Sequence, residues 1–356
     1  MTSVDLSARR LRCPLKASYQ LSFGSIEGFD TLLVKARCGG AIGYGEATVL
    51  NGYTEETIEG SWALARAVIA RHTGRAAMDI LAATDRLTAK APFVATAFRT
   101  AIEMAAGHQL LIGDSQKRVP MLAIINSSTE CGIAKEIEAR LAEGYGTLKI
   151  KVGFACETDL ARVRFIQSLV TGTNVRLTVD ANQGYSREEG CAFAARIVPD
   201  NILFFEQACD KHDWNAAVAV ARAASVPVML DESIYDLADV ERAASLGAAQ
   251  YVKLKLMKCG GLDKLIAALG RSRALGLKAV LGNGVATDIG CWMEASAGHG
   301  RIETAGEMNG FLKPKRHLLE NPLAVEQGHL VIPAGWWPIL DDDAVDAFRV
   351  DEIGVN

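Results

Sequence analysis

The chain lacks several patterns that would place it among other classes of protein. Its eight cysteines are dispersed and form no CxxC pair, which indicates reduced thiols in a cytoplasmic protein, most of them small core residues. We find no signal peptide and no apolar run of about 20 residues, so we expect no membrane partner. The net charge of −4 and the lack of a basic run give no indication of a nucleic-acid partner.

The residues that are present describe an ordinary globular protein with a substantial core. Apolar residues make up 49% of the chain and charged residues 22%, which is typical of soluble domains. A chain of 356 residues has room for one barrel of roughly 250 residues and a smaller domain of about 100. We expect an α+β capping domain over 1–117 and a barrel over 118–320. A turn-rich, strand-poor segment over 321–356 should pack back on the capping domain.

From about residue 118, strand-like runs alternate with amphipathic stretches. This alternation is typical of parallel strands whose connecting helices cover the sheet. Eight such runs occur, at 119–125, 146–152, 175–181, 201–206, 226–232, 251–257, 278–284 and 301–308. They predict an α/β fold of the (β/α)₈, TIM-like type, capped by an α+β domain that the N-terminal region and the C-terminal tail build together.

Three successive runs end on an acidic residue. Asp180, Glu206 and Asp231 are separated by 26 and 25 residues, which matches one strand–helix–strand step of a parallel barrel. Their carboxylates should therefore converge at the barrel mouth, where three charges without a counterion would repel one another. A hard divalent cation with oxygen ligands resolves this repulsion, and Mg²⁺ or Mn²⁺ fits best.

Lysines flank this acidic cluster on two strands. Residues two apart face the same side of a strand, so Lys149 and Lys151 both point into the barrel or both reach solvent from the strand end. The nearby carboxylates favour the interior position, because an unpaired buried ammonium is costly. Lys253 and Lys255 repeat the spacing on the sixth strand, with Lys255 nearer the tip. Since strands two and six lie opposite each other, Lys151 and Lys255 should address two faces of one substrate.

These motifs, in this order, resemble the enolase superfamily, specifically its muconate lactonizing enzyme subgroup. The resemblance covers essentially the full length and rests on KIK at 149–151, DAN at 180–182, FFEQ at 204–207, LDES at 230–233 and KLMKCGG at 255–261. It implies that Asp180, Glu206 and Asp231 bind Mg²⁺ and that Lys151 and Lys255 are the acid–base pair. It also implies an even-numbered homo-oligomer.

The resemblance implies supporting roles for three further residues. Lys149 would hydrogen-bond the substrate carboxylate or lower the pKa of Lys151. Asn182 and Glu232 would hold the ligands and lysines in orientation. The mandelate racemase branch, by contrast, uses a histidine at the end of strand seven. The corresponding run here, KAVLGNGVATD, contains no histidine, which excludes that branch.

The residues around the expected substrate pocket give less information about which substrate the enzyme accepts. KLMKCGGL resembles dipeptide epimerases, whose strand eight carries a DxD pair, whereas this chain has Glu307 and Asn309 at those positions. Glu307 also matches an active-site glutamate of muconate cycloisomerases. Asn283, between two glycines, offers an amide for polar recognition. Two capping loops, around 22–28 and 50–56, should close the pocket, and their best candidate contacts are Phe23, Phe29, Asn51 and Tyr53.

We therefore expect a Mg²⁺-dependent enzyme that abstracts the proton α to a carboxylate through a metal-stabilised enediolate. A racemase or epimerase of an amino-acid derivative is the favoured function, because a carboxylate at Glu307 suits a substrate that carries nitrogen. A muconate-type cycloisomerase or a β-eliminating dehydratase is the alternative, and a non-catalytic metal-binding barrel is the remote one. In each enzymatic case the partner is a small-molecule carboxylate.

Overall fold

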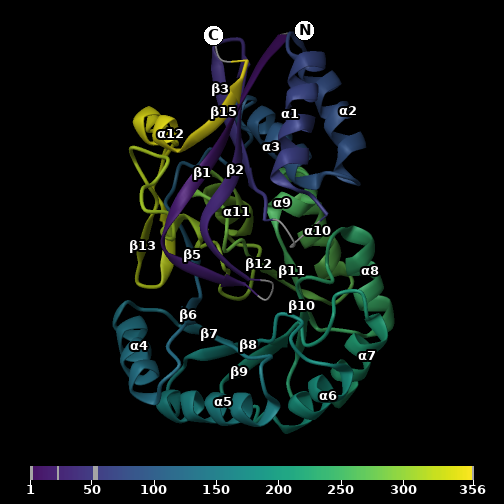
Figure 1. The fold of residues 1–356 in the computed structure, drawn as a ribbon, viewed down its shortest axis with the longest axis vertical. Helices are drawn as coiled ribbons and strands as arrows, with labels where there is room; N and C mark the ends of the chain where they lie inside the picture. Colours follow the sequence, from purple (N-terminus) through teal and green to yellow (C-terminus); the bar gives the residue numbers. More distant parts are fainter. Residues whose placement is uncertain (1–2, 22–23, 51–54, 355–356) are drawn as a thin grey trace.

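The computed structural model describes residues 3–21, 24–50 and 55–354 (Figure 1). The two ends of the chain meet in one antiparallel sheet, of order β15-β1-β2-β3 with β4 beside β1. Its strands are β1 (Ser3–Leu21), β2 (Gly24–Cys38), β3 (Ala41–Thr48), β4 (Arg75–Ala76) and β15 (Arg349–Ile353). Helices α1 (Ile58–His72), α2 (Ala77–Thr88) and α3 (Pro92–Ala105) lie beside this capping sheet. α3 packs directly on β2 and β3.

A curled parallel sheet of seven strands, in sequential order, forms the second part of the fold (Figure 1). Its strands are β6 (Ala123–Ile125), β7 (Thr147–Lys151), β8 (Arg176–Asp180), β9 (Ile202–Glu206), β10 (Val228–Leu230), β11 (Tyr251–Leu254) and β12 (Lys278–Leu281). The helices that follow them are α4 (Glu130–Ala142), α5 (Cys156–Val170), α6 (Arg187–Arg196), α7 (Trp214–Ala223), α8 (Leu237–Leu246), the short α9 (Leu256–Cys259), α10 (Leu262–Ala274) and α11 (Asp288–Gly298). The expected α/β barrel with a capping domain is confirmed.

The predicted eighth barrel strand is wrong as a strand. Within 301–308 the structure has only a single parallel bridge, between Gly306 and Met121. Gly306 N donates to Pro120 O and Leu122 N to Gly306 O, each at 2.9 Å, while Glu307 N donates to Leu281 O at 2.8 Å. The segment therefore still closes the ring between β12 and the first barrel strand, but with too few paired residues to form a ladder.

The C-terminal segment contains more strands than the sequence predicted. β13 (Ala324–Glu326) and β14 (His329–Ile332) form a three-stranded sheet with β5 (Lys117–Pro120). After α12 (Asp342–Phe348), β15 enters the capping sheet beside β1. The expectation that 321–356 would be strand-poor was thus wrong. β13 and β14 form a local hairpin, and β14 and β15 also pair with the distant β5 and β1. The domain boundaries at 117 and 320 stay a prediction.

Local signals explain where several barrel helices begin and end. Ser186 and Glu189 form a reciprocal capping box at the start of α6, and Asp236 and Asp239 do the same for α8. α8 ends at Gly247, whose φ of 62° is left-handed, a conformation that glycine adopts without steric cost. These caps fix where the helices begin and end, so that the strand ends stay aligned at the mouth of the barrel.

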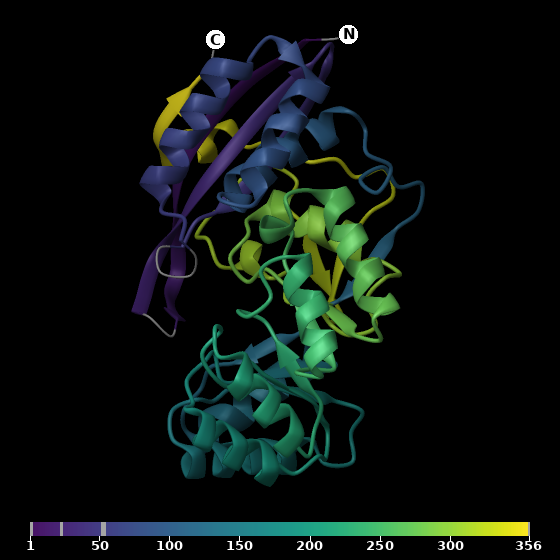
Figure 2. The same cartoon turned by 90° about the vertical axis from the view of Figure 1, so that its right-hand side faces the viewer.

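The capping domain covers one end of the barrel and contacts it through its hairpin, through α3 and through β3, which packs on α11. Figure 2 shows the β1–β2 hairpin reaching from the capping sheet toward the barrel. Leu15 bridges Pro314, and Lys16 N donates to Lys313 O at 2.9 Å. α3 contacts α9 on the other side. Within the described ranges, no helix is long and apolar enough to cross a bilayer.

Candidate active site

The three predicted carboxylates come together at the C-terminal ends of neighbouring strands. Asp180 ends β8 and is in register with Glu206, which ends β9. Asp231 follows β10 directly. All three are buried, with 0%, 1% and 4% exposure. Parallel strands that end on an acid thus bring the three carboxylates to neighbouring strand ends on one side of the sheet, as the spacing predicted.

Four lysines from opposite sides of the barrel reach these carboxylates. The Lys151 ammonium lies 2.6 Å from Asp180 and the Lys255 ammonium 2.7 Å from Asp231. Lys149 and Lys253 lie deeper, and each is 1% exposed. Since β7 and β11 are the second and sixth strands of the barrel, Lys151 and Lys255 approach from the two sides that the sequence predicted.

Lys149 and Lys253 form a buried ionic network with the two glutamates. Lys149 Nζ lies 3.1 Å from Glu206 and 2.9 Å from Glu307. Lys253 Nζ lies 2.8 Å from Glu206 and 2.6 Å from Glu307. Both lysine contacts to Glu307 are made by Oε2. Glu307, on the segment that closes the ring, is therefore already paired with two lysines.

The pKa values follow from this arrangement. Burial lowers the pKa of Lys149 and of Lys253, but the surrounding carboxylates outweigh burial and raise both. The pKa of Glu307 is lowered because the two ammonium groups outweigh its burial. The pKa of Glu206 is raised by burial and by the adjacent Asp180. Lys149 and Lys253 are thus fixed cations, unsuited to accept a proton.

Asn182 and Glu232 connect Lys151 to the neighbouring carboxylates. Asn182 Oδ1 accepts a short hydrogen bond from Lys151 Nζ, and its Nδ2 donates to Glu232 Oε1 at 3.0 Å. The backbone N of Asn182 donates to Asp180 Oδ1 at 2.8 Å. Burial, followed by the neighbouring Asp231, raises the pKa of Glu232 to about 7. These contacts fix the direction of the Lys151 side chain.

The predicted substrate-binding residues are only partly assembled. Glu307 and Asn309 are buried at the barrel mouth. The side-chain oxygen of Asn283 accepts from Ala286 N at 3.1 Å, so it shapes the turn that leads to α11. Phe29 is fully buried and packs edge-on against Tyr19. The other loop candidates, Phe23, Asn51 and Tyr53, lie outside the described residues.

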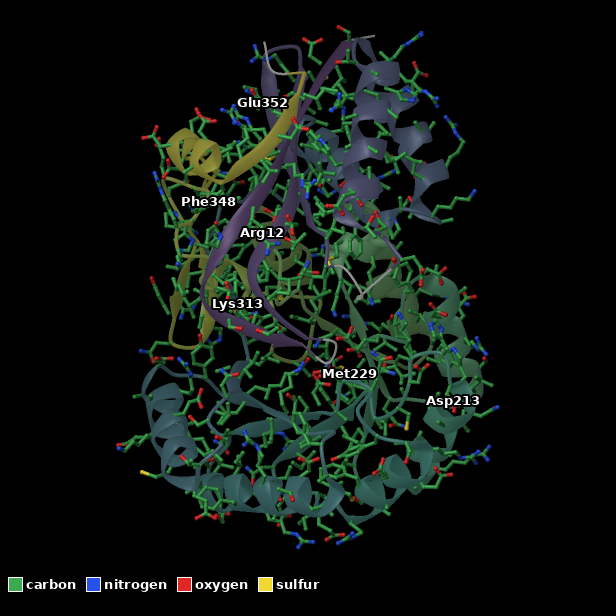
Figure 3. All side chains as sticks on the ribbon, in the orientation of Figure 1. Arg12, Asp213, Met229, Lys313, Phe348 and Glu352 are labelled. Atoms are coloured by element: carbon green, nitrogen blue, oxygen red, sulfur yellow. The ribbon has the colours of Figure 1, made fainter. Side chains whose placement is uncertain are left out.

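The sequence analysis assigned no role to two lysines near the site, Lys253 and Lys313. Lys253 repeats the spacing of the Lys149–Lys151 pair, and that repetition was the signal for it. Lys313 lies after the strand-eight segment, beside β1 (Figure 3). No local pattern marks it, because its neighbours come from distant parts of the chain.

The donor set fits a hard divalent cation. Asp180, Glu206 and Asp231 offer only carboxylate oxygens. Burial raises the pKa of Glu206 most and the neighbouring Asp180 raises it further, and a cation would relieve this crowding of like charges. Within the described part of the chain, no three Asp, Glu, His or Cys side chains are gathered into a ready-made cage. Lys149 and Lys253 instead bridge neighbouring carboxylates.

Comparison with known proteins identifies the family. Residues 132–336, more than half of the chain, match the Enolase C-terminal domain-like family. The N-succinyl-L-Arg/Lys racemase of Bacillus cereus is 26% identical over 332 residues, which is 88% of each chain.

Two solved structures share the fold. The muconate lactonizing enzyme of Pseudomonas fluorescens, complexed with muconolactone, has a TM-score of 0.88 and 24% identity over 98% of this chain and 99% of its own. The dipeptide epimerase of Enterococcus faecalis, complexed with Mg and the dipeptide L-Leu-L-Tyr, has a TM-score of 0.84 and 23% identity over 94% of this chain and 99% of its own. The chain is therefore an enzyme of the enolase superfamily and belongs to its mandelate racemase/muconate lactonizing enzyme subgroup, among isomerases.

Proposed function

We propose that the enzyme removes and returns the proton α to a carboxylate, as a racemase or epimerase of an amino-acid derivative. The observation that carries this proposal is the opposed pair Lys151 and Lys255, each beside one of the buried carboxylates. A proton donor or acceptor on each face of a planar carbon is what inversion at that carbon requires.

The chain's own residues divide the remaining work. Asp180, Glu206 and Asp231 would hold Mg²⁺, for which Mn²⁺ could substitute. When bound, such a cation supplies positive charge where the substrate carboxylate gains negative charge on losing its α proton. Lys149 would contribute a further fixed positive charge at that end of the pocket. The carboxylates are held from β8, β9 and β10, so the reacting carboxylate should point toward those strands.

Lys151 would exchange the proton on one face and Lys255 on the other. Each lysine must spend part of its time neutral to act as a base. Lys151 has the more open position, with 32% of its side chain exposed, and it is oriented by Asn182. Lys255 is held by Asp231. Glu232 accepts a hydrogen bond from Asn182, which in turn contacts Lys151. Glu232 would thereby position Lys151.

The relatives support a substrate derived from an amino acid. They include the N-succinyl-L-Arg/Lys racemase of Bacillus cereus and a hydrophobic dipeptide epimerase of Enterococcus faecalis, which is 26% identical over 290 residues, 78% of this chain and 81% of its own. Both names describe inversion of configuration in a derivative of an amino acid.

A second candidate is a muconate-type cycloisomerase or a β-eliminating dehydratase, which needs only one of the two lysines as a base. The ion pairs of Glu307 with Lys149 and Lys253 support this second candidate. A free carboxylate at strand eight would repel a diacid, but Glu307 Oε2 lies within 2.9 Å of two ammonium groups. A purely anionic substrate is therefore compatible with this pocket.

The test is deuterium incorporation from D₂O, followed by mass spectrometry across N-acyl amino acids, dipeptides and hydroxy acids, with Mg²⁺ and with EDTA. We expect deuterium at Cα in both configurations of an amino-acid derivative, with Mg²⁺ only. Deuterium in a diacid or hydroxy acid together with ring closure or loss of water would instead establish the second candidate. Metal-independent exchange would overturn the proposal.

A further inference from the structure

Lys255 stands at the start of the single helical turn α9, and this turn decides where its side chain can point. The pairing of β11 with β12 ends at Leu254, so Lys255 lies just outside the strand ladder. Its backbone O accepts from Lys258 N at 3.0 Å and from Cys259 N at 3.3 Å, and its ammonium lies 2.7 Å from Asp231. The direction of Lys255 therefore depends on what holds α9 in place.

One hydroxyl group of the cap holds this turn at both ends. Thr96, on α3, is 1% exposed. Its Oγ1 donates toward two carbonyls of the turn, Met257 O at 3.1 Å and Leu256 O at 3.3 Å. The same Oγ1 accepts from Gly260 N at 3.0 Å, where the turn ends. A buried backbone group that loses such a partner finds no water to replace it, so α9 depends on this side chain.

The hydroxyl of Thr96 behaves differently from that of the next threonine on α3. Thr100 is equally buried, and its Oγ1 donates to Thr96 O at 2.8 Å within its own helix. Threonine in a helix commonly bonds the carbonyl four residues earlier in this way. The Thr96 hydroxyl instead makes its described hydrogen bonds to the barrel. Thr96 thus joins the cap to α9, whereas Thr100 supports α3 alone.

The lysine on the opposite face is held by the barrel. Lys151 is the last residue of β7 and is in register with Asp180 on β8. Its Nζ lies 2.6 Å from that carboxylate and donates a short hydrogen bond to Asn182. The turn after Lys255 is held by Glu294 on α11, through Leu256 N at 2.6 Å, and also by the cap. The two lysines therefore differ in whether the cap supports them.

We propose that Thr96 is a positioning residue for Lys255, through which the cap orients one of the two proton-transfer groups and not the other. A disturbance at Thr96 then slows proton exchange from the enantiomer that Lys255 serves and spares the enantiomer that Lys151 serves. This inference rests on the proposed function for the roles of the two lysines. The competing role is purely structural, in which Thr96 only helps the cap and the barrel to pack together.

The test is α-proton exchange in D₂O, measured as an initial rate for each enantiomer of a substrate that the wild type accepts. Thr96→Val removes the hydroxyl with little change in shape. We expect it to slow exchange from one enantiomer by about 10- to 100-fold, the cost of misplacing a reacting group by about 1 Å. Exchange from the other enantiomer should stay near the wild-type rate. Lys255→Ala identifies the enantiomer that Lys255 serves, which should be the one that is slowed.

Two further variants separate the hydroxyl from its surroundings. Thr96→Ser keeps the hydroxyl and should exchange both enantiomers at rates near wild type. Thr100→Val, at an equally buried position on the same helix, is the matched control and should slow neither. Equal slowing of both enantiomers by Thr96→Val, or no slowing of either, would rule the proposal out in favour of the structural role.

Amide hydrogen exchange tests the same contact without any substrate. If the wild type exchanges the α proton of no tested compound, the proposed function fails separately, and the Gly260 N–H, followed by ¹H–¹⁵N NMR, decides this inference. Faster exchange of this amide in Thr96→Val, with wild-type protection in Thr96→Ser and Thr100→Val, supports the role of Thr96 in holding α9. Wild-type protection in Thr96→Val contradicts it.

Discussion

At the scale of single residues, the four lysines of the site fall into two pairs that differ in burial and in the number of acids around them. Lys149 and Lys253 are enclosed by carboxylates, and their pKa values are raised. Lys151 and Lys255 stand nearer the opening, each beside one acid. A cluster of buried acids needs the first pair as counterions, which leaves the second pair for the proton transfer proposed above.

Replacing Glu206 with Gln should weaken binding of Mg²⁺ and Mn²⁺ by at least the roughly 10- to 100-fold that outer-shell changes cost at metal sites. The change removes a charged oxygen ligand with little change in volume. Titration calorimetry of the metal-stripped protein measures it, with the exposed Glu188→Gln as the control. Unchanged metal affinity, or full activity in metal-free protein, would refute the assignment of this ligand.

Replacing Lys253 with Met should lower the free energy of unfolding by about 3 kcal/mol, the low end for breaking a buried ion pair. Glu206 and Glu307 would each lose one ammonium but keep Lys149. Chemical denaturation without metal measures the loss, and Lys278→Met, an exposed lysine on β12, provides the control. A variant as stable as the wild type would mean that Lys149 alone balances both acids.

At the scale of elements, the segment after β11 is held from two sides. Leu256, next to Lys255, donates its N–H to Glu294 Oε1 on α11 at 2.6 Å. Gly260 N donates to Thr96 on α3 at 3.0 Å. Glu294 is fully buried. The end of the sixth strand, and with it the direction of Lys255, therefore depends on contacts from both the barrel and the cap.

Glu294 should make the stability of the protein depend on pH. Burial raises its pKa from 4.5 to about 8, so the unfolded chain releases this proton near pH 4.5 while the folded chain keeps it until about pH 8. Stability from this group is complete at low pH and is lost as the pH rises through that range. We expect the unfolding free energy of the wild type, measured against Glu294→Gln, to fall by roughly 2–4 kcal/mol between pH 5 and pH 8.5.

Gln keeps an oxygen that can accept the Leu256 N–H and cannot ionise in this range. Subtracting the variant therefore cancels the other titrating groups, including Glu46, whose burial raises its pKa to about 7. The exposed Glu303→Gln should leave the wild-type profile unchanged. Parallel curves for the wild type and Glu294→Gln would show that Glu294 is ionised in the folded protein.

The sequence allowed prediction of those features that depend on a strand and its end. Asp180, Glu206 and Lys151 follow from apolar runs that finish on a charged residue. The closing segment at 301–308 was predicted as a full strand because its single bridge has no separate local signal. Lys313 was overlooked because it reaches Tyr19 through pairing between segments almost 300 residues apart, such as Lys16 with Leu312.

At the scale of the whole molecule, the cap and the barrel form one site. The barrel brings acids from three adjacent strands and lysines from two opposed ones to a common mouth. The cap adds Tyr19 through its hairpin, and α3 supports the segment that follows the sixth strand. The barrel thus supplies the buried carboxylates and the lysines, while the cap contributes contacts at the mouth.

The most direct measurement is α-proton exchange in D₂O, followed by ¹H NMR, for each enantiomer of an active substrate with Lys151→Ala and Lys255→Ala. If the two lysines serve opposite faces, each variant loses exchange from one enantiomer and keeps it from the other, and the two variants show mirror patterns. Both should stay folded, because Asp180 keeps Lys149 as a counterion and Asp231 keeps Lys253. Racemisation in both directions by either single variant would contradict the two-base account.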